Sequence, residues 1–253
     1  MAAVTTTTTT LRAVIVEPRW HLALSLVLCN LFQVINHHHQ TPFEVTVFHG
    51  IRNRDFVREA IQEARVDANR VTLTEIPGCD NLTVSQYSEM LTRADFWRSF
   101  PEEHLLIFQT DSILSTTSPV QLCEFLDFDY VGAPWRHLPQ LTCGGNGGLS
   151  LRRKSAMVEA CTYFAQDPIF RRKRIIIPED LQFAYYFQPR RKNQYYLPDR
   201  HTSARFSVES IYYPNLHPLG IHKAWARLSP RDWQSLKKQD AWFAELECWQ
   251  KTQ

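Results

Sequence analysis

Four consecutive polar residues, Gln109-Thr110-Asp111-Ser112, directly follow the apolar run at residues 105–108. That run has the length of a buried strand and contains neither Gly nor Pro. Ligands of open α/β sheets bind beyond the carboxyl ends of the strands, so a carboxylate placed there can face a cleft. We interpret Asp111 as a carboxylate that faces a ligand at such a strand end. The alternative is a turn aspartate that caps local backbone amides.

Three further stretches carry side chains or backbone suited to chemistry. Glu179 and Asp180 follow Pro178 at a predicted helix start, where acids also simply complement the helix dipole. Residues 144–148 hold four of the eight glycines, which indicates a backbone that passes very close to another group. His222 and Lys223 lie near the end of the chain, and a lone histidine is more often a packed or surface residue.

Composition excludes several classes of protein and of partner. A net charge of +2 argues against nucleic acid, and the basic clusters at residues 152–154, 171–174 and 190–192 are expected to be solvated. No Gly-x-Gly-x-x-Gly follows the first predicted strand, and the glycine run lacks the Gly-Lys-Ser/Thr of a P-loop. Six scattered cysteines without CxxC or zinc spacing indicate reduced thiols. With no signal peptide or membrane span recognised, we expect a cytoplasmic protein.

The first half of the chain alternates strands and helices, which must position these side chains. Strands are expected at residues 13–16, 43–48, 71–76 and 105–108, and helices at 21–35, 55–68 and 85–97. A strand, a helix and a strand within about 35 residues form a βαβ unit, which implies parallel pairing. The polar tail at residues 1–12 is expected to be disordered, and residues 13–253 to form a single domain.

The second half is expected to continue the same architecture. Helices are predicted at residues 118–126, 155–164, 178–187 and 229–249, and strands at 130–135 and 175–177, while 195–213 reads as strands or ordered loop. Together these elements predict an α/β fold with a mixed, mainly parallel sheet flanked by helices.

Four motifs occur in a recognisable order: Gln-Thr-Asp-Ser after a strand, Gly-Asn-Gly-Gly, Pro-Glu-Asp at a helix start, and Gly-Ile-His-Lys. With Val-Ile-Val-Glu-Pro-Arg, Val-Phe-His-Gly and Asp-Tyr-Val-Gly-Ala-Pro-Trp, they resemble an uncharacterised family of predicted GT-A-fold glycosyltransferases of fungi, bacteria and large viruses. The resemblance covers about residues 13 to 226. It implies a single Rossmann-like GT-A domain that transfers a sugar from a nucleotide-diphosphate sugar.

The resemblance assigns a donor and metal site. GT-A enzymes carry an Asp-x-Asp motif that binds a divalent cation bridging the donor phosphates, and Asp111 matches its last position. Gln109 stands where the motif has its first Asp, so the cation has one carboxylate fewer. A C-terminal histidine completes such a site, and His222 matches it. The implied cofactor is Mn²⁺ or Mg²⁺.

The remaining site residues follow from the same resemblance. An acidic pair at a helix start supplies the base in inverting members, and Glu179-Asp180 matches it, with Asp180 in the base position. The donor nucleotide is expected to contact Glu17, Arg19, Gln109, Thr110, Asp111, Ser112 and Lys223. The donor-sugar and acceptor cleft is expected to be lined by Trp135, Gly145, Asn146, Gly147 and Gly148.

These assignments predict a hexosyltransferase-like enzyme that uses a UDP- or GDP-linked donor and a glycan or other hydroxyl acceptor. The alternative is a non-catalytic module that binds nucleotide sugars or glycans on a degraded GT-A scaffold, which the missing first Asp favours. The enzymatic prediction requires that Asp111, Asp180 and His222, far apart in sequence, meet around one pocket.

Overall fold

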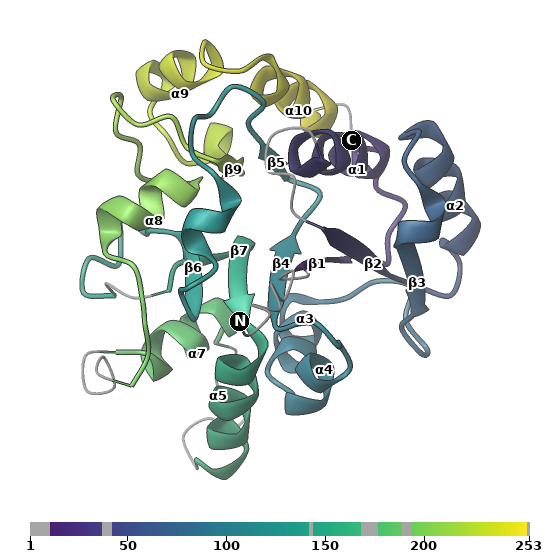
Figure 1. Ribbon diagram of the computed structural model, residues 1–253. Coiled ribbons are helices and arrows are strands. Elements are labelled where there is room, and N and C mark those ends of the chain that lie inside the picture. Colours follow the sequence, from purple (N-terminus) through teal and green to yellow (C-terminus); the bar gives the residue numbers. More distant parts are fainter. Residues whose placement is uncertain (1–10, 37–41, 142–143, 168–176, 189–193, 252–253) are drawn as a thin grey trace, which may run out of the picture.

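A six-stranded sheet with the strand order β3-β2-β1-β4-β7-β6 forms the centre of the protein (Figure 1). The computed structural model describes residues 11–36, 42–141, 144–167, 177–188 and 194–251. The strands of this sheet are β1 (Leu11–Val16), β2 (Phe43–His49), β3 (Val71–Glu75), β4 (His104–Phe108), β6 (Tyr130–Ala133) and β7 (Asn146–Arg153).

Parallel pairing dominates the sheet. β1 pairs in parallel with β2 and with β4, and β2 pairs in parallel with β3. β7 runs antiparallel to both of its neighbours, β4 and β6. The predicted mixed, mainly parallel sheet is therefore confirmed. Because β1 and β4 are parallel neighbours, the residues that follow them, Glu17 and Asp111, both lie beyond the carboxyl ends of these strands.

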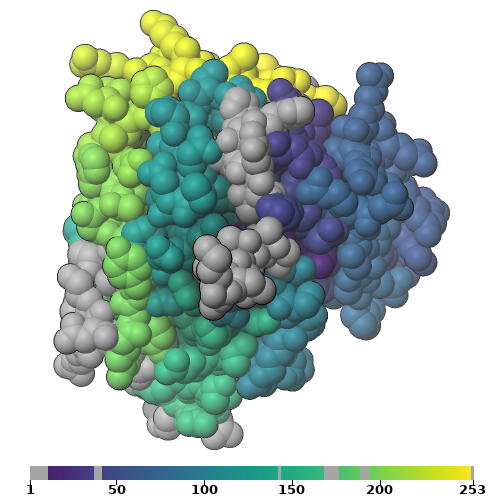
Figure 2. Space-filling model, viewed as in Figure 1, coloured from purple at the N-terminus to yellow at the C-terminus, as the bar shows by residue number. Residues whose placement is uncertain are grey.

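Helices cover both faces of the sheet, as the buried apolar clusters show. The first cluster joins α1, α2, α9 and α10 to one face, and the second joins α3, α4, α5 and α7 to the other. The helices are α1 (Leu24–Val34), α2 (Arg54–Glu63), α3 (Val84–Leu91), α4 (Ala94–Arg98), α5 (Lys154–Gln166), α7 (Glu179–Tyr186), α8 (Arg200–Phe206), α9 (Pro230–Lys237) and α10 (Ala241–Lys251), with 3-10 turns at Ala68–Arg70, Leu122–Phe125 and Ala224–Ala226. Figure 2 shows the C-terminal segment, in yellow, running across the top of the molecule.

A second, three-stranded sheet with the order β5-β9-β8 adjoins the first. It consists of β5 (Ser112–Leu114), β8 (Ser207–Val208) and β9 (Gly220–His222). The sequence predicted neither β5 nor β9, whereas β8 lies within the segment 195–213 that was expected to be strands or ordered loop. The side chain of buried Asn30, in α1, bonds the backbone N–H and C=O of Leu114, which fixes β5 on that helix. This small sheet brings residue 222 opposite residue 112 in an antiparallel pair.

Two predicted helices are each two helices in the structure. The helix predicted at 85–97 breaks at Arg93, which is extended, and the indole N–H of Trp97 donates to the carbonyl of Leu91 at 2.7 Å. The helix predicted at 229–249 breaks before Asp240, whose carboxylate accepts hydrogen bonds from Trp242 N–H and from the Ser115 hydroxyl. In both places a side chain satisfies a backbone group that the end of a helix leaves without a partner.

Three other predictions were wrong, wholly or in part, in position or type. No helix begins at Ser118, whose hydroxyl instead donates to the carbonyl of His217; a 3-10 turn starts only at Leu122, after a capping box. The segment 195–213, predicted as strands or ordered loop, does contain the short strand β8, but it also contains α8, which Asp199 caps by accepting from the Thr202 N–H. The helix predicted to reach residue 68 ends at Glu63, before Arg65 takes a left-handed φ of 53°.

Some predictions fall partly outside the described residues. Residues 1–10 of the expected tail lie there, whereas Leu11 and Arg12 belong to β1. Of the strand predicted at 175–177 only Ile177 is described, and it is not in a strand. The basic clusters 171–174 and 190–192 also lie outside the described residues. Across the residues that are described, no helix combines the length and apolar character needed to cross a bilayer.

Candidate functional site

Asp111 lies in the tight turn that joins β4 to β5. The N–H of Gln109 and the hydroxyl of Ser112 both donate to the carbonyl of Gly148 in β7, at 2.9 and 2.8 Å. The N–H of Lys223, after β9, donates to the backbone carbonyl of Asp111 at 2.9 Å. The turn is thus held between two strands, which fixes the direction of the Asp111 side chain.

His222 and Lys223 meet the carboxylate of Asp111. His222 Nε2 lies 3.1 Å from Asp111 Oδ1, and Lys223 Nζ lies 3.9 Å from Oδ2. Burial would raise the pKa of Asp111, but the charge of His222 and its contact, with a smaller effect of Lys223, lower it to about 2. Burial likewise would lower the pKa of His222, and Asp111 and Glu209 raise it. Asp111 is therefore an anion beside two potential cations.

Asp111 Oδ1 is a buried oxygen that has no hydrogen-bond partner among the described residues, although His222 Nε2 lies 3.1 Å from it. Two ligands that hold one Mg²⁺ at right angles lie about 3 Å apart, since each bond is about 2.1 Å. The 3.1 Å between Oδ1 and Nε2 meets that requirement. Within the described residues no cluster of three His, Cys, Asp or Glu side chains forms a metal site. A cation would therefore need water or phosphate as further ligands, as Mg²⁺ commonly does.

Gln109 takes no part in this cluster, although it occupies the first position of the predicted motif. Its side chain lies beside the phenol of Tyr87, in α3, where it acts to lower the pKa of that phenol. The motif thus contributes one carboxylate, from Asp111. Thr110 turns instead toward β1: its hydroxyl donates to Glu17 Oε2 at 3.1 Å.

Glu17 and Arg19 form an ordered pair at the end of β1. Arg19 Nε and Nη2 donate to the two carboxylate oxygens of Glu17, each at 2.8 Å. The amide of buried Asn53 donates to the backbone carbonyls of both residues. Glu17 is 3% exposed, whereas the Arg19 side chain is 55% exposed and lies within electrostatic reach of Asp111. Of this pair, Arg19 is the residue available to a ligand.

Only glycine fits at residue 148, because the imidazole of His222 lies against its backbone. A Cβ at residue 148 would overlap three atoms of the His222 ring. Gly145 has a φ of 132° and lies against the backbone of Gly132. A side chain at residue 145 would therefore meet strand β6. The glycine run does mark a backbone in close approach to other groups, and these groups belong to the protein.

We expect Gly148→Ala to lower the melting temperature by several degrees, because the added methyl group meets the His222 ring and overpacking costs about 1–3 kcal/mol. The control is the double variant Gly148→Ala/His222→Ala, which removes the obstructing ring. Differential scanning calorimetry should show that the alanine at 148 costs little once residue 222 is Ala. Equal losses in both backgrounds would contradict the contact as the cause.

Glu179 and Asp180 begin α7, as the sequence predicted, and have different surroundings. Glu179 is 5% exposed, and its Oε1 accepts a hydrogen bond of 2.9 Å from Arg152 Nη2. Asp180 Oδ2 accepts from the N–H of Gly147 at 3.1 Å, and Oδ1 from the N–H of Leu181 at 2.8 Å. Burial, and then the charge of Glu179, raise the pKa of Asp180 to about 7. Asp180 is the acid whose protonation changes near neutrality.

The structure gathers the predicted residues into two groups on either side of consecutive glycines. A Cβ on Gly147 would meet Glu179, Arg152 and Asp180, whereas one on Gly148 would meet His222. Adjacent Cα atoms are about 3.8 Å apart, so both groups lie at the same end of β7. Asp111, His222 and Lys223 contact one another. Asp180 joins Glu179 in the second group, and no contact links it to Asp111 or His222 among the described residues, so the expected meeting of these three residues around one pocket stays a prediction.

The predicted cleft residues Trp135 and Asn146 have mainly internal contacts. Trp135 is 4% exposed and packs with Leu141 and Ala184, so it offers a ligand little surface. The Asn146 carbonyl oxygen Oδ1 accepts from the N–H of Gly148 at 2.8 Å, and its Nδ2 donates to Glu209 Oε1 at 3.3 Å.

Sequence reasoning missed two buried charged residues. Arg152 belongs to a cluster expected to be solvated, yet it is 0% exposed and its guanidinium contacts the rings of Trp97, Tyr130 and Phe183. Glu209 is 5% exposed, and its Oε1 lies 3.8 Å from His222 Nδ1. The alternation of β7 places Arg152 on the same side of the strand as Ser150, opposite Leu149 and Leu151, so it gave no signal of burial, and nothing in the sequence around Glu209 marks that residue either.

Comparisons with known proteins agree with this architecture. Residues 72–222 match the family described as "Protein of unknown function (DUF5672)", and the chain belongs to that family. Among curated proteins, no sequence match was found.

Solved structures of glycosyltransferases share the fold. The apo form of the glycosyltransferase GlyE of Streptococcus pneumoniae TIGR4 superposes with a TM-score of 0.53 at 11% identity, over 96% of this chain and 64% of that one. The bifunctional glycosyltransferase WbbM gives 0.51 at 11% identity, over 94% of this chain and 51% of that one. The chain thus spans between about half and two thirds of the length of these structures. It has a glycosyltransferase-like fold.

Proposed function

We propose that this protein is a nucleotide-sugar-dependent glycosyltransferase whose donor diphosphate binds at Asp111, His222 and Lys223. One observation carries the proposal: at the carboxyl end of β4, Asp111 Oδ1 is buried 3.1 Å from His222 Nε2 and has no hydrogen bond within the part of the chain that the structure describes. An anion that meets an imidazole and an ammonium group beyond a parallel strand is suited to a cation-bridged phosphate. The glycosyltransferase-like fold supports the same assignment.

The donor end of the site must stabilise a leaving diphosphate. Lys223 and Arg19 have side chains that are 47% and 55% exposed, and both lie within electrostatic reach of Asp111. Their positive charges stabilise the negative charge that develops on the diphosphate. Asp111 and His222 would hold Mn²⁺ or Mg²⁺, which when bound supplies further positive charge at the phosphate oxygens. The donor is a UDP- or GDP-linked sugar.

The acceptor end must remove a proton from a hydroxyl group. In the proposed step, the acceptor oxygen forms a bond to the anomeric carbon, while the bond from that carbon to the phosphate oxygen breaks and the diphosphate leaves with the electron pair. Asp180 takes the hydroxyl proton, which a single displacement with inversion requires. Glu179 stays paired with Arg152, so its role is to support the start of α7.

A second candidate function is a non-catalytic module that binds nucleotide sugars or glycans. The observation that favours it is residue 109, a glutamine whose side chain lies beside Tyr87, so that the motif has a single carboxylate. A site with one carboxylate holds a divalent cation more weakly than a site with two. The two candidates differ in whether the bond between sugar and diphosphate is broken.

We expect the protein to bind UDP- or GDP-sugars in the presence of Mn²⁺ and to lose at least about tenfold in affinity when EDTA removes the cation. Isothermal titration calorimetry with a panel of donors, first with Mn²⁺ and then with EDTA, measures this difference. Re-addition of Mn²⁺ in excess over EDTA should restore the original affinity.

The same samples separate the two candidate functions when released nucleoside diphosphate is assayed with a panel of hydroxyl acceptors. Release above the rate without protein supports the transferase. Binding without release, across all acceptors, supports the module. Full donor affinity in EDTA would show that donor binding needs no cation and that Lys223 and Arg19 bind the phosphates.

A further inference from the structure

Glu209 lies behind His222, on the side of the ring opposite Asp111. It follows β8, which pairs in parallel with β9 so that Val208 is opposite Ile221. Continuing that register by one residue places Glu209 beside His222. The structure accordingly has Glu209 Oε1 3.8 Å from His222 Nδ1, while Nε2 of the same ring lies 3.1 Å from Asp111 Oδ1. The imidazole therefore has a carboxylate at each nitrogen.

The ring and the carboxylate behind it are held in place. Gly148 contacts the ring from β7 and leaves no room for a Cβ. Asn146, also in β7, holds Glu209 Oε1 through its Nδ2 at 3.3 Å, and its own Oδ1 is fixed by the N–H of Gly148. Glu209 and His222 are 5% and 6% exposed. Neither side chain is a surface group that happens to lie near the other.

In the residues that the structure describes, the buried His222 Nδ1 has no hydrogen-bond partner. A buried polar atom of this kind is costly unless it is paired, directly or through a water molecule. Glu209 Oε1, at 3.8 Å, is a charged acceptor that a small side-chain rotation or one bridging water brings within reach. The pairing requires that Nδ1 carries a proton.

The two neutral forms of His222 have opposite effects on the proposed donor site. A proton on Nε2 would be donated to Asp111 Oδ1, and the pair would then be closed to a cation. A proton on Nδ1 leaves the lone pair of Nε2 directed toward the same space as Asp111 Oδ1. Metal-binding histidines commonly donate their other N–H to a carboxylate, which fixes this form.

We propose that Glu209 is a positioning residue: it holds the proton of His222 on Nδ1 and thereby keeps Nε2 and Asp111 Oδ1 open to one divalent cation. Asn146 aligns the Glu209 carboxylate for that purpose. The inference rests on the proposed function for the identity of the cation site. The position of the proton on His222 can be measured independently of any activity.

The experiment is two-bond ¹H–¹⁵N correlation spectroscopy on protein labelled at histidine, at a pH where the imidazole is neutral. The His222→Asn variant assigns the signals. In the wild type we expect the pattern of an Nδ1–H imidazole, both alone and with Mg²⁺ and UDP. In Glu209→Gln we expect a shift toward the Nε2–H form in the absence of Mg²⁺. The dissociation constant of Mn²⁺ in the presence of UDP, measured by electron paramagnetic resonance, should rise about 10–100-fold in that variant.

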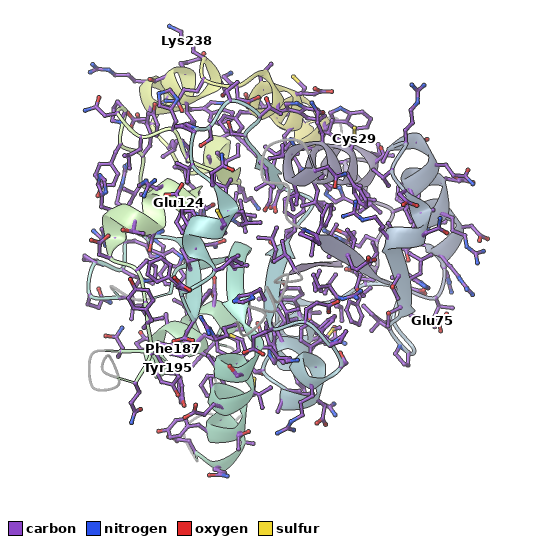
Figure 3. The ribbon with its side chains drawn as sticks, in the orientation of Figure 1. Cys29, Glu75, Glu124, Phe187, Tyr195 and Lys238 are labelled. Atoms are coloured by element: carbon purple, nitrogen blue, oxygen red, sulfur yellow. The ribbon has the colours of Figure 1, made fainter. Side chains whose placement is uncertain are left out.

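Glu75→Gln is the matched control, because Glu75 is an exposed glutamate at the end of the edge strand β3 (Figure 3). It should change neither the spectrum nor the Mn²⁺ affinity. An Nε2–H pattern in the wild type overturns the proposal even if Glu209→Gln fails to fold. An unchanged spectrum and unchanged Mn²⁺ affinity in folded Glu209→Gln also overturn it. If the wild type shows the Nδ1–H pattern but binds neither Mn²⁺ nor UDP, the proposed function fails while Glu209 retains control of the His222 proton.

Discussion

Asp180→Asn is expected to lower turnover by about 10²–10⁴-fold and to leave donor affinity within about twofold, because general-base catalysis contributes in that range. Asn keeps the size of the side chain and can still accept a hydrogen bond from Gly147 or Leu181, but it cannot take a proton. Steady-state release of nucleoside diphosphate measures turnover, and calorimetric titration of the donor measures affinity. Unchanged turnover would reject Asp180 as the base.

The pKa of Asp180 gives this prediction a second, independent measurement. A base must be deprotonated, so wild-type turnover should rise with pH through about 7. Because burial holds this pKa above its ordinary value, the folded state binds the proton more tightly than the unfolded state does. Stability is therefore present at low pH and is lost as pH rises through about 7. At pH 8 the Asn variant should be more stable than the wild type, by about 1–3 kcal/mol.

Asp95→Asn provides the control for Asp180→Asn. Asp95 is also an acid in the first turn of a helix, α4, but it is exposed and pairs only with Arg98 on the surface. Its replacement should leave turnover unchanged and should not produce a stability gain that grows between pH 5 and 8. A gain of equal size in both variants would mean that the effect belongs to helix starts in general.

Asp111→Asn is expected to reduce Mn²⁺-dependent donor affinity by at least about 100-fold, and turnover with it, because the amide removes the one carboxylate of the motif. Its effect on stability should have the opposite sign to that of Asp180→Asn. The neighbours of Asp111 lower its pKa to about 2, so its charge stabilises the fold above pH 4, and that contribution is lost as pH falls toward 2. The variant should lose up to about 2 kcal/mol at neutral pH.

Calorimetry of unfolding at pH 7 and donor titration test the second prediction together. The control is Asp129→Asn, because Asp129 is also a partly buried acid paired with a basic side chain, Arg153, and it lies outside both groups of the site. It should lose stability without losing donor affinity. Unchanged Mn²⁺-dependent donor binding in Asp111→Asn would show that the carboxylate of Asp111 does not belong to the phosphate site. The non-catalytic binding module would then be the better assignment.

The sequence predicted the parallel half of the sheet well because β1, β2, β3 and β4 are compact apolar runs with polar ends. It also predicted the positions of Asp111 and of the acids at the start of α7, since each follows a local signal: a strand end, or Pro178 before a helix. Strands β5, β8 and β9 have two or three residues, which is too short for any periodicity. Their existence depends on tertiary pairing, and so does the meeting of His222 with Asp111.

The failures of prediction have a common physical origin in distant side chains. The break at Asp240 depends on Ser115 and Thr116, more than a hundred residues away, which share its carboxylate. Arg152 is buried because Glu179 and three aromatic rings from separate elements surround it. Glu209 becomes part of the site only because β8 pairs with β9. None of these relations leaves a pattern in the local sequence.

The amide of Gln250, in the last turn of α10, donates to the backbone carbonyl of Thr110 at 2.8 Å, in the turn that carries Asp111. That helix lies beyond the segment matched by the family, which ends at residue 222. The final helix therefore acts as a brace for the loop that would receive the donor. Proteins that share the matched segment but differ in their last two helices would need another anchor for this loop, and their affinity for phosphate should vary with how firmly that anchor holds.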